Sequence, residues 1–143
     1  MFPRRLASFA RLDAAERSLA LRAIAWLAVT RVALHIVAFN RLRAFAEARR
    51  DVPQAGGDWP QRVRRAMSRA ARTLPGSRCL ARALAAEFLL VRGGSPARLV
   101  LGVSRDAGRT LDAHAWVESD GFIVVGEIEH ERFRPLAASG RRA

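Results

Sequence analysis

Apolar residues predominate from residue 19 to residue 39, and this pattern predicts a long helix that is broken at most once. Asp13 and Glu16 precede the apolar run with the spacing of a capping box. In such a box, each of the two side chains accepts a hydrogen bond from the other residue's backbone N–H. We therefore expect the helix to begin directly after Asp13, and residues 1–12 to form a basic, irregular lead-in.

Three basic residues interrupt this apolar run: Arg22, Arg31 and His35. The segments between them are shorter than the roughly 20 apolar residues that span a bilayer, and an arginine near the bilayer centre is costly. A membrane span is therefore disfavoured. We expect the helix to pack against the rest of the chain, or to lie at a membrane surface beside the arginine-rich residues 41–50.

A second helix is predicted over residues 61–74, after a linker rich in Gly, Pro and Asp at residues 51–60. Its apolar residues lie on one side, and arginines occupy the others: Arg62, Arg65, Arg69 and Arg72. No aromatic residues alternate with these arginines, so a solvated face is favoured over a nucleic-acid site. We divide the chain into an N-terminal helical region, residues 1–58, and a core, residues 59–143, which together form one compact unit.

A third helix is predicted after Pro75 and Gly76, which interrupt the preceding pattern. Ser77 is the expected N-cap, and Gly93 ends the pattern. Between them, apolar residues recur at helical spacing: Leu80, Leu84, Phe88 and Val91.

The only cysteine, Cys79, falls in the first turn of this third helix. Unpaired backbone N–H groups and the positive end of the helix dipole favour a thiolate there, and Arg78 and Arg82 add positive charge. Cys79 is therefore a candidate nucleophile. The alternative, a small buried apolar residue without a chemical role, stays open on local sequence alone.

The periodicity then changes from 3.6 to 2, which predicts strands over residues 98–104, 111–118 and 122–128. Asp120 and Gly121 lie between the last two strands and favour a type I′ hairpin turn, which requires positive φ at both central residues. With this two-residue turn, His114 faces Glu127, and the two side chains project to the same side. A three-residue turn would instead place His114 opposite Gly126.

His114 and Glu127 thus form a candidate pair of base and acid, with Glu118 as the alternative acid farther along the same strand. A buried structural role is the competing interpretation of His114.

The composition limits the class of protein. The chain has 143 residues, enough for one domain, and half of them are apolar. Its 25 basic residues, all arginine, exceed 13 acidic residues to give a net charge of +12. This excess suits an acidic peptide, a nucleic acid or a membrane surface. A single cysteine excludes an internal disulfide, and no secretory signal is evident, so a reducing, cytoplasmic compartment is expected.

A cysteine at a helix start, followed by strands that carry His and an acid, is the order of a papain-like or transglutaminase-like triad. Residues 79–84, 94–103 and 113–118 are similar to those of the transglutaminase-like cysteine proteases of lasso-peptide biosynthesis, called maturation B proteins. The resemblance covers about residues 60–130.

This resemblance implies an α+β fold in which N-terminal helices, with the catalytic cysteine at a helix N-terminus, pack on a small antiparallel sheet. It also implies a triad of Cys79, His114 and Glu127, with Glu in place of the usual Asp. The expected activity is removal of the leader from a ribosomally made precursor, a step in the maturation of antimicrobial peptides, without a cofactor or metal.

The resemblance further implies partners. The chain looks like the stand-alone form of the protease, which acts with a separate leader-recognition protein on the precursor peptide in the bacterial cytoplasm. The lasso cyclase would act next. No nucleic-acid partner is expected, and contact with a membrane surface is left open.

Two alternatives come from other functional classes. The same triad could transfer the acyl group to an amine, as transglutaminases do. A non-catalytic basic scaffold could instead bind a membrane or nucleic acid through its arginine-rich helices.

Overall fold

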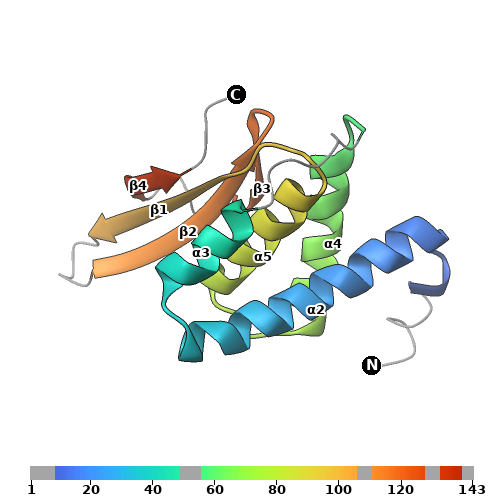
Figure 1. The fold of residues 1–143 in the computed structure, drawn as a ribbon, viewed down its shortest axis with the longest axis horizontal. Coiled ribbons are helices and arrows are strands. Elements are labelled where there is room, and N and C mark those ends of the chain that lie inside the picture. The colour runs from blue at the N-terminus through green and yellow to red at the C-terminus, as the bar shows by residue number, and fades with distance from the viewer. Residues whose placement is uncertain (1–8, 49–55, 106–110, 128–132, 140–143) are drawn as a thin grey trace.

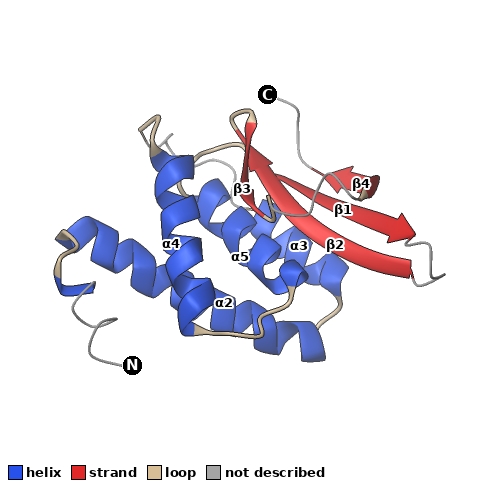
Figure 2. Ribbon diagram, turned by 180° about the vertical axis from the view of Figure 1, so that it is seen from behind, coloured by secondary structure: helices blue, strands red, loops and turns tan. Residues whose placement is uncertain are grey.

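The computed structural model describes residues 9–48, 56–105, 111–127 and 133–139, and over these residues the chain has an α+β fold (Figure 1). Its helices are α2 (Ala14–Ile36), α3 (Phe39–Glu47), α4 (Trp59–Thr73) and α5 (Cys79–Arg92). Its strands are β1 (Arg98–Arg105), β2 (Leu111–Ser119), β3 (Phe122–Val125) and β4 (Arg134–Ser139). The strands form one antiparallel sheet in the order β3-β2-β1-β4, and the helices lie on one side of it (Figure 2).

The start of α2 confirms the predicted cap. Asp13 is the N-cap residue, and its carboxylate accepts a hydrogen bond of 2.7 Å from the backbone N–H of Glu16. The carboxylate of Glu16 lies 3.6 Å from the guanidinium of Arg65 on α4, so this residue also links the two helices. The predicted single break separates α2 from α3 at Val37 and Ala38, which both have extended backbone.

Helix α5 is central to the larger core. Ten of its residues are buried, and eight of them belong to the core that α5 shares with α2, α4 and the sheet. The sheet contributes Leu99, Ala115, Val117 and Val124 to this core. The hydroxyl of Thr30 on α2 lies 3.1 Å from the carbonyl oxygen of Ala81 on α5 and shares its proton with the Trp26 and Leu27 carbonyls of its own helix, so it links the two helices inside the core.

A smaller cluster covers the face of the sheet that points away from the helices. Its buried residues are Val100, Trp116 and Phe133, the last of which lies just before β4. Gly102 makes room for this cluster, because a Cβ atom there would lie 2.6 Å from the Trp116 ring and 2.8 Å from the Cβ of Phe133. Alternate residues of β1 and β2 thus serve two separate clusters, as the period of a strand requires.

The hairpin between β2 and β3 confirms the predicted turn but corrects the predicted register. Asp120 and Gly121 have φ of 48° and 81°, as a type I′ turn requires, and Ser119 pairs with Phe122. A bulge then follows, because Glu118 pairs with Ile123 whereas Val117 pairs with Val125. The extra residue on β3, Val124, is buried in the larger core. The shift arises from this bulge and not from a longer turn.

Candidate active site

Cys79 lies in the first turn of α5, as predicted, and is its first residue, with a free and partly buried thiol. The predicted N-cap is wrong. Arg78 takes that position with extended backbone, while the hydroxyl of Ser77 donates a hydrogen bond of 2.7 Å to the carbonyl oxygen of Leu74. Ser77 therefore stabilises the turn that joins α4 to α5. The N–H groups of the first turn of a helix have no intrahelical acceptors, so those beside Cys79 can stabilise negative charge on a reacting oxygen.

His114 lies on β2 opposite Gly102 of β1. Its ring is half-buried between aromatic neighbours, with centroid distances of 5.0 Å to Phe133 and 6.2 Å to Trp116. Its Nε2 atom lies 3.2 Å from the carbonyl oxygen of Gly126. A carbonyl oxygen can only accept, so this contact places the proton of the neutral ring on Nε2 and leaves the lone pair on Nδ1. The ring therefore has a defined orientation and a defined basic nitrogen.

Glu127 does not face His114, which corrects the predicted pairing. Because of the bulge at Val124, Val117 lies opposite Val125 and not opposite Val124, so the register that would place Glu127 opposite His114 does not continue past the bulge. The carboxylate of Glu127 instead forms an ion pair with Arg64 on α4, on the helical side of the sheet. Both side chains are about half exposed.

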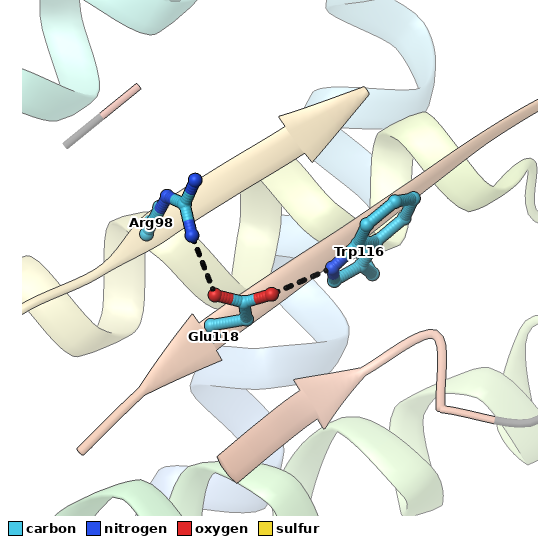
Figure 3. Close-up of polar contacts among 3 residues, drawn as sticks. All are labelled: Arg98, Trp116 and Glu118. Carbon is cyan, nitrogen blue, oxygen red and sulfur yellow. Dashed lines mark hydrogen bonds and ion pairs between the residues drawn. The ribbon is translucent and has the colours of Figure 1, made fainter. Parts of the chain in front are cut away.

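Glu118, the alternative acid, is held by two other residues on the sheet face away from the helices (Figure 3). Its carboxylate accepts a hydrogen bond of 3.0 Å from the indole N–H of Trp116 and lies 3.1 Å from the guanidinium of Arg98. These contacts hold the Glu118 carboxylate beside the buried indole of Trp116. In this arrangement Glu118 has a structural role.

The thiol and the imidazole come from elements that pack directly on one another. Cys79 contacts the larger core, to which Ala115, the residue after His114, also belongs. Helix α5 and strand β2 run in the same direction, so their first residues lie toward the same end of the molecule (Figure 1). However, His114 and Trp116 lie on the face of β2 that points away from α5. The described residues contain no hydrogen bond between the imidazole of His114 and the sulfur of Cys79.

A small cleft of about 250 Å³ lies between α4, α5 and the end of β3. Arg82 enters it from α5, one turn after Cys79 and on the same side of the helix. Gly126 and Glu127 line it from the sheet, and Arg64 lines it from α4. The cleft thus connects the helix that carries the thiol with the segment that binds the imidazole of His114.

Arg64 and Trp116 had no role in the sequence-based site, and Gly126 entered it only as the residue opposite His114 in the alternative register. The contacts of Arg64 and Gly126 depend on how α4 and the end of β3 come together in space, which no local pattern encodes. Gly126 is the most informative of them, since its φ of +92° is a conformation that favours glycine.

The family model of the transglutaminase-like superfamily matches residues 18–138 of the chain. The matched range spans Cys79, His114 and Glu127. It is to the superfamily as a whole, whose members include cysteine proteases and acyltransferases. Comparisons with curated proteins and with solved structures gave no match.

Proposed function

Because the chain belongs to the transglutaminase-like superfamily, we propose that it is a cysteine protease that removes the leader from a lasso-peptide precursor. The observation that carries the proposal is the position of the only thiol, at the first residue of a helix that packs directly on the strand bearing His114. The similarity of residues 79–84, 94–103 and 113–118 to maturation B proteins supports the choice of substrate class.

The proposed reaction has two steps. The sulfur of Cys79, having lost its proton to His114, attacks the carbonyl carbon at the junction of leader and core, and the C–N bond breaks. The imidazolium of His114 returns the proton to the leaving amine, and a thioester links the leader to Cys79. Water then attacks the thioester with His114 as the general base, and this releases the leader with a free carboxylate and restores the thiol.

The backbone of α5 supplies the charge stabilisation for both steps. A tetrahedral intermediate carries a negative oxygen, and the N–H groups of the first turn, with the positive end of the helix dipole, lie beside the attacking sulfur. The proposal requires the imidazole to come within hydrogen-bonding distance of the sulfur when the peptide is bound. Because His114 lies with Trp116 on the face of β2 that points away from α5, this requires the ring to leave the Gly126 carbonyl and change its side-chain conformation when the peptide binds.

The third member of the proposed triad is Glu127, following the resemblance. In the free protein, however, Glu127 pairs with Arg64, and His114 contacts the carbonyl of Gly126. There the Gly126 carbonyl fixes the tautomer of the ring, the task that an acid performs in a triad. We therefore expect Glu127 to contribute less to the rate than His114.

The partners follow from the same proposal. A separate leader-recognition protein would deliver the precursor, and the lasso cyclase would consume the released core. The net charge of +12 favours acidic surfaces on such partners or on the leader. An association of this kind would weaken steeply as the salt concentration rises.

The test is cleavage of the precursor by purified variants in the presence of the recognition partner. Cys79→Ala and His114→Ala should abolish cleavage while leaving the thermal unfolding transition in place. Asp112→Asn is the matched control, because Asp112 is exposed on the same strand, two residues before His114. Full activity of Cys79→Ala would refute the proposal.

Acyl transfer to an amine is the second candidate function, because the superfamily also contains acyltransferases. Both reactions share the thioester on Cys79 and differ in the second nucleophile. Adding a primary amine to the reaction separates them. A hydrolase yields the free carboxylate, whereas an acyltransferase yields mainly the amide.

A further inference from the structure

Helix α2 carries an exposed apolar stripe along its outer side. Leu21, Val29, Val32 and Ile36 are 57%, 52%, 59% and 79% exposed, respectively. Their spacings of eight, three and four residues place them on one side of a helix, and the stripe extends over about 22 Å at 1.5 Å per residue. Scattered exposed apolar residues are ordinary, but four large ones aligned on a single helix form a surface that water solvates poorly.

The opposite side of α2 is fixed in the protein core. Leu19, Ala23, Leu27 and Thr30 are buried, and Thr30 bonds to α5 as described above. By length and composition α2 could cross a membrane, and 28% of its most apolar window is buried. Crossing would require α2 to leave this core and expose α4 and α5. The structure therefore favours a helix that lies on a surface and remains packed against the domain.

Arginines border the stripe along both of its edges. At 100° per residue, Arg22 lies about 20° beyond one edge and Arg17 about 40° beyond the other, and both are exposed. Arg31 is also exposed but lies about 80° beyond the second edge, where its guanidinium donates to the carbonyl oxygen of Pro75. The only acidic residue of α2 is Glu16, in its first turn, which pairs with Arg65. Long arginine side chains can keep their charges at the height of lipid headgroups while the stripe lies deeper.

The cationic border continues at the end of the stripe. A cleft of about 530 Å³ lies between the last turns of α2, the start of α3 and the segment before α5. Arg31 and His35 line it from α2, and Arg78 lines it from the N-cap of α5. Three basic side chains around a partly apolar cleft suit the phosphate of a lipid headgroup.

We propose that α2 binds the surface of an anionic bilayer, with the stripe inserted among the acyl chains and the flanking arginines at the headgroups. A convex apolar band with cations on both edges matches a bilayer, which offers apolar depth bordered by negative charge on every side. A protein partner would need an apolar groove with acidic rims on both edges. This inference does not depend on the peptidase activity.

The experiment is co-sedimentation of the full chain with vesicles, once with phosphatidylcholine alone and once with added phosphatidylglycerol. Wild-type protein should sediment with the anionic vesicles and remain in solution with the neutral ones. The double variant Val32→Gln/Ile36→Gln should bind at least about tenfold more weakly. Arg22→Gln should bind more weakly than wild type at low salt and resemble it more closely at high salt.

Matched controls remove equally exposed groups elsewhere. Leu111 and Leu136, on β2 and β4, are 63% and 69% exposed, so Leu111→Gln/Leu136→Gln removes two large apolar side chains from the sheet. Arg134→Gln removes an exposed arginine from β4. Both controls should bind as wild type does, and thermal unfolding followed by circular dichroism checks that every variant is folded.

Several outcomes would overturn the proposal. They are failure of the wild-type protein to sediment with anionic vesicles, equal binding to neutral vesicles, and equal losses in the α2 and sheet variants. Resistance of bound protein to alkaline carbonate extraction would indicate a spanning helix instead. Self-association that Val32→Gln/Ile36→Gln abolishes, without vesicle binding, would assign the stripe to a second copy of the chain.

Discussion

The imidazole of His114 and the backbone carbonyl of Gly126 are joined by a hydrogen bond of 3.2 Å between Nε2 and the oxygen. This contact crosses from β2 to the residue that follows β3, and so its geometry depends on the bulge between the two strands. A side-chain substitution cannot remove the backbone carbonyl of Gly126. A substitution that disturbs the backbone conformation of Gly126 can therefore test whether this hydrogen bond matters.

Gly126→Ala should destabilise the protein and disturb His114 together. The φ of +92° is strained for any residue with a Cβ, and that atom would lie 2.7 Å from the Cβ of Trp116. We expect a loss of about 1–3 kcal/mol in the free energy of unfolding, measured in urea. Gly57→Ala is the control, because a Cβ there meets no atom within 4 Å, and it should change stability by less than about 0.5 kcal/mol.

If Gly126→Ala keeps wild-type stability and cleavage, the bond is not required to hold the ring. If stability falls while cleavage by the folded fraction is unchanged, the role of Gly126 is confined to folding. The assignment of an orienting role needs a lower turnover number, kcat, in the folded variant.

Glu118 should contribute to stability more than to catalysis. Trp116 is 3% exposed, so Glu118→Ala would leave its indole N–H without the acceptor that the structure shows. A hydrogen bond to a charged group contributes about 1.5–3 kcal/mol, and losing this bond should cost an amount in that range. Arg98→Ala removes only the partly exposed ion pair and should cost less than about 1 kcal/mol.

Urea denaturation of both variants measures this difference, and cleavage is measured where both remain folded. A thousandfold loss of turnover in folded Glu118→Ala would contradict the structural assignment and make Glu118 the acid of the triad, as its place on the strand of His114 allows.

Thr30→Val should loosen the attachment of α2 to α5. The two side chains have nearly the same shape, but valine cannot donate to the carbonyl oxygen of Ala81. The expected cost is about 1 kcal/mol in urea denaturation. Ser18→Ala, at an exposed position of the same helix, is the control and should have little effect. Equal stability of Thr30→Val and wild type would show that apolar packing alone holds α2.

Local patterns predicted the parts of the site that depend on neighbours in sequence. Asp13 caps α2, Cys79 begins a helix, and the Asp120-Gly121 pair turns the hairpin, because each depends on backbone geometry within a few residues. The α+β class, which the resemblance implied, is confirmed by the four helices and the antiparallel sheet of the described residues.

The register beyond the hairpin was not predictable in this way. A regular strand would pair Val124 with Val117 of β2. In the structure Val124 is instead an extra residue of β3 that is buried in the larger core, and Val117 pairs with Val125. Whether a strand bulges depends on how much apolar surface the facing helices offer, and here α4 and α5 provide it. The same packing brings Arg64 to Glu127, a contact between residues 63 positions apart. The edge strand β4 was likewise absent from the predicted strands.

The ion pair of Glu127 and Arg64 is about half exposed, so its contribution to stability should be below about 1 kcal/mol. Arg64→Gln and Glu127→Gln should each unfold close to wild type. If the Gly126 carbonyl orients His114, then Glu127→Gln should lower kcat by less than about tenfold, while His114→Ala lowers it by about a thousandfold or more. Precursor cleavage under saturating conditions measures both.

Arg64→Gln discriminates between the two possible roles of the carboxylate. Were Glu127 to leave Arg64 and bind the imidazole during the reaction, removing the arginine would remove a competing contact of the carboxylate and raise kcat, and Glu127→Gln would abolish that gain. With Gly126 as the orienting group, Arg64→Gln leaves kcat unchanged in either background. A gain in the single variant that disappears in the double variant would therefore restore Glu127 as the acid that the hairpin pattern predicted.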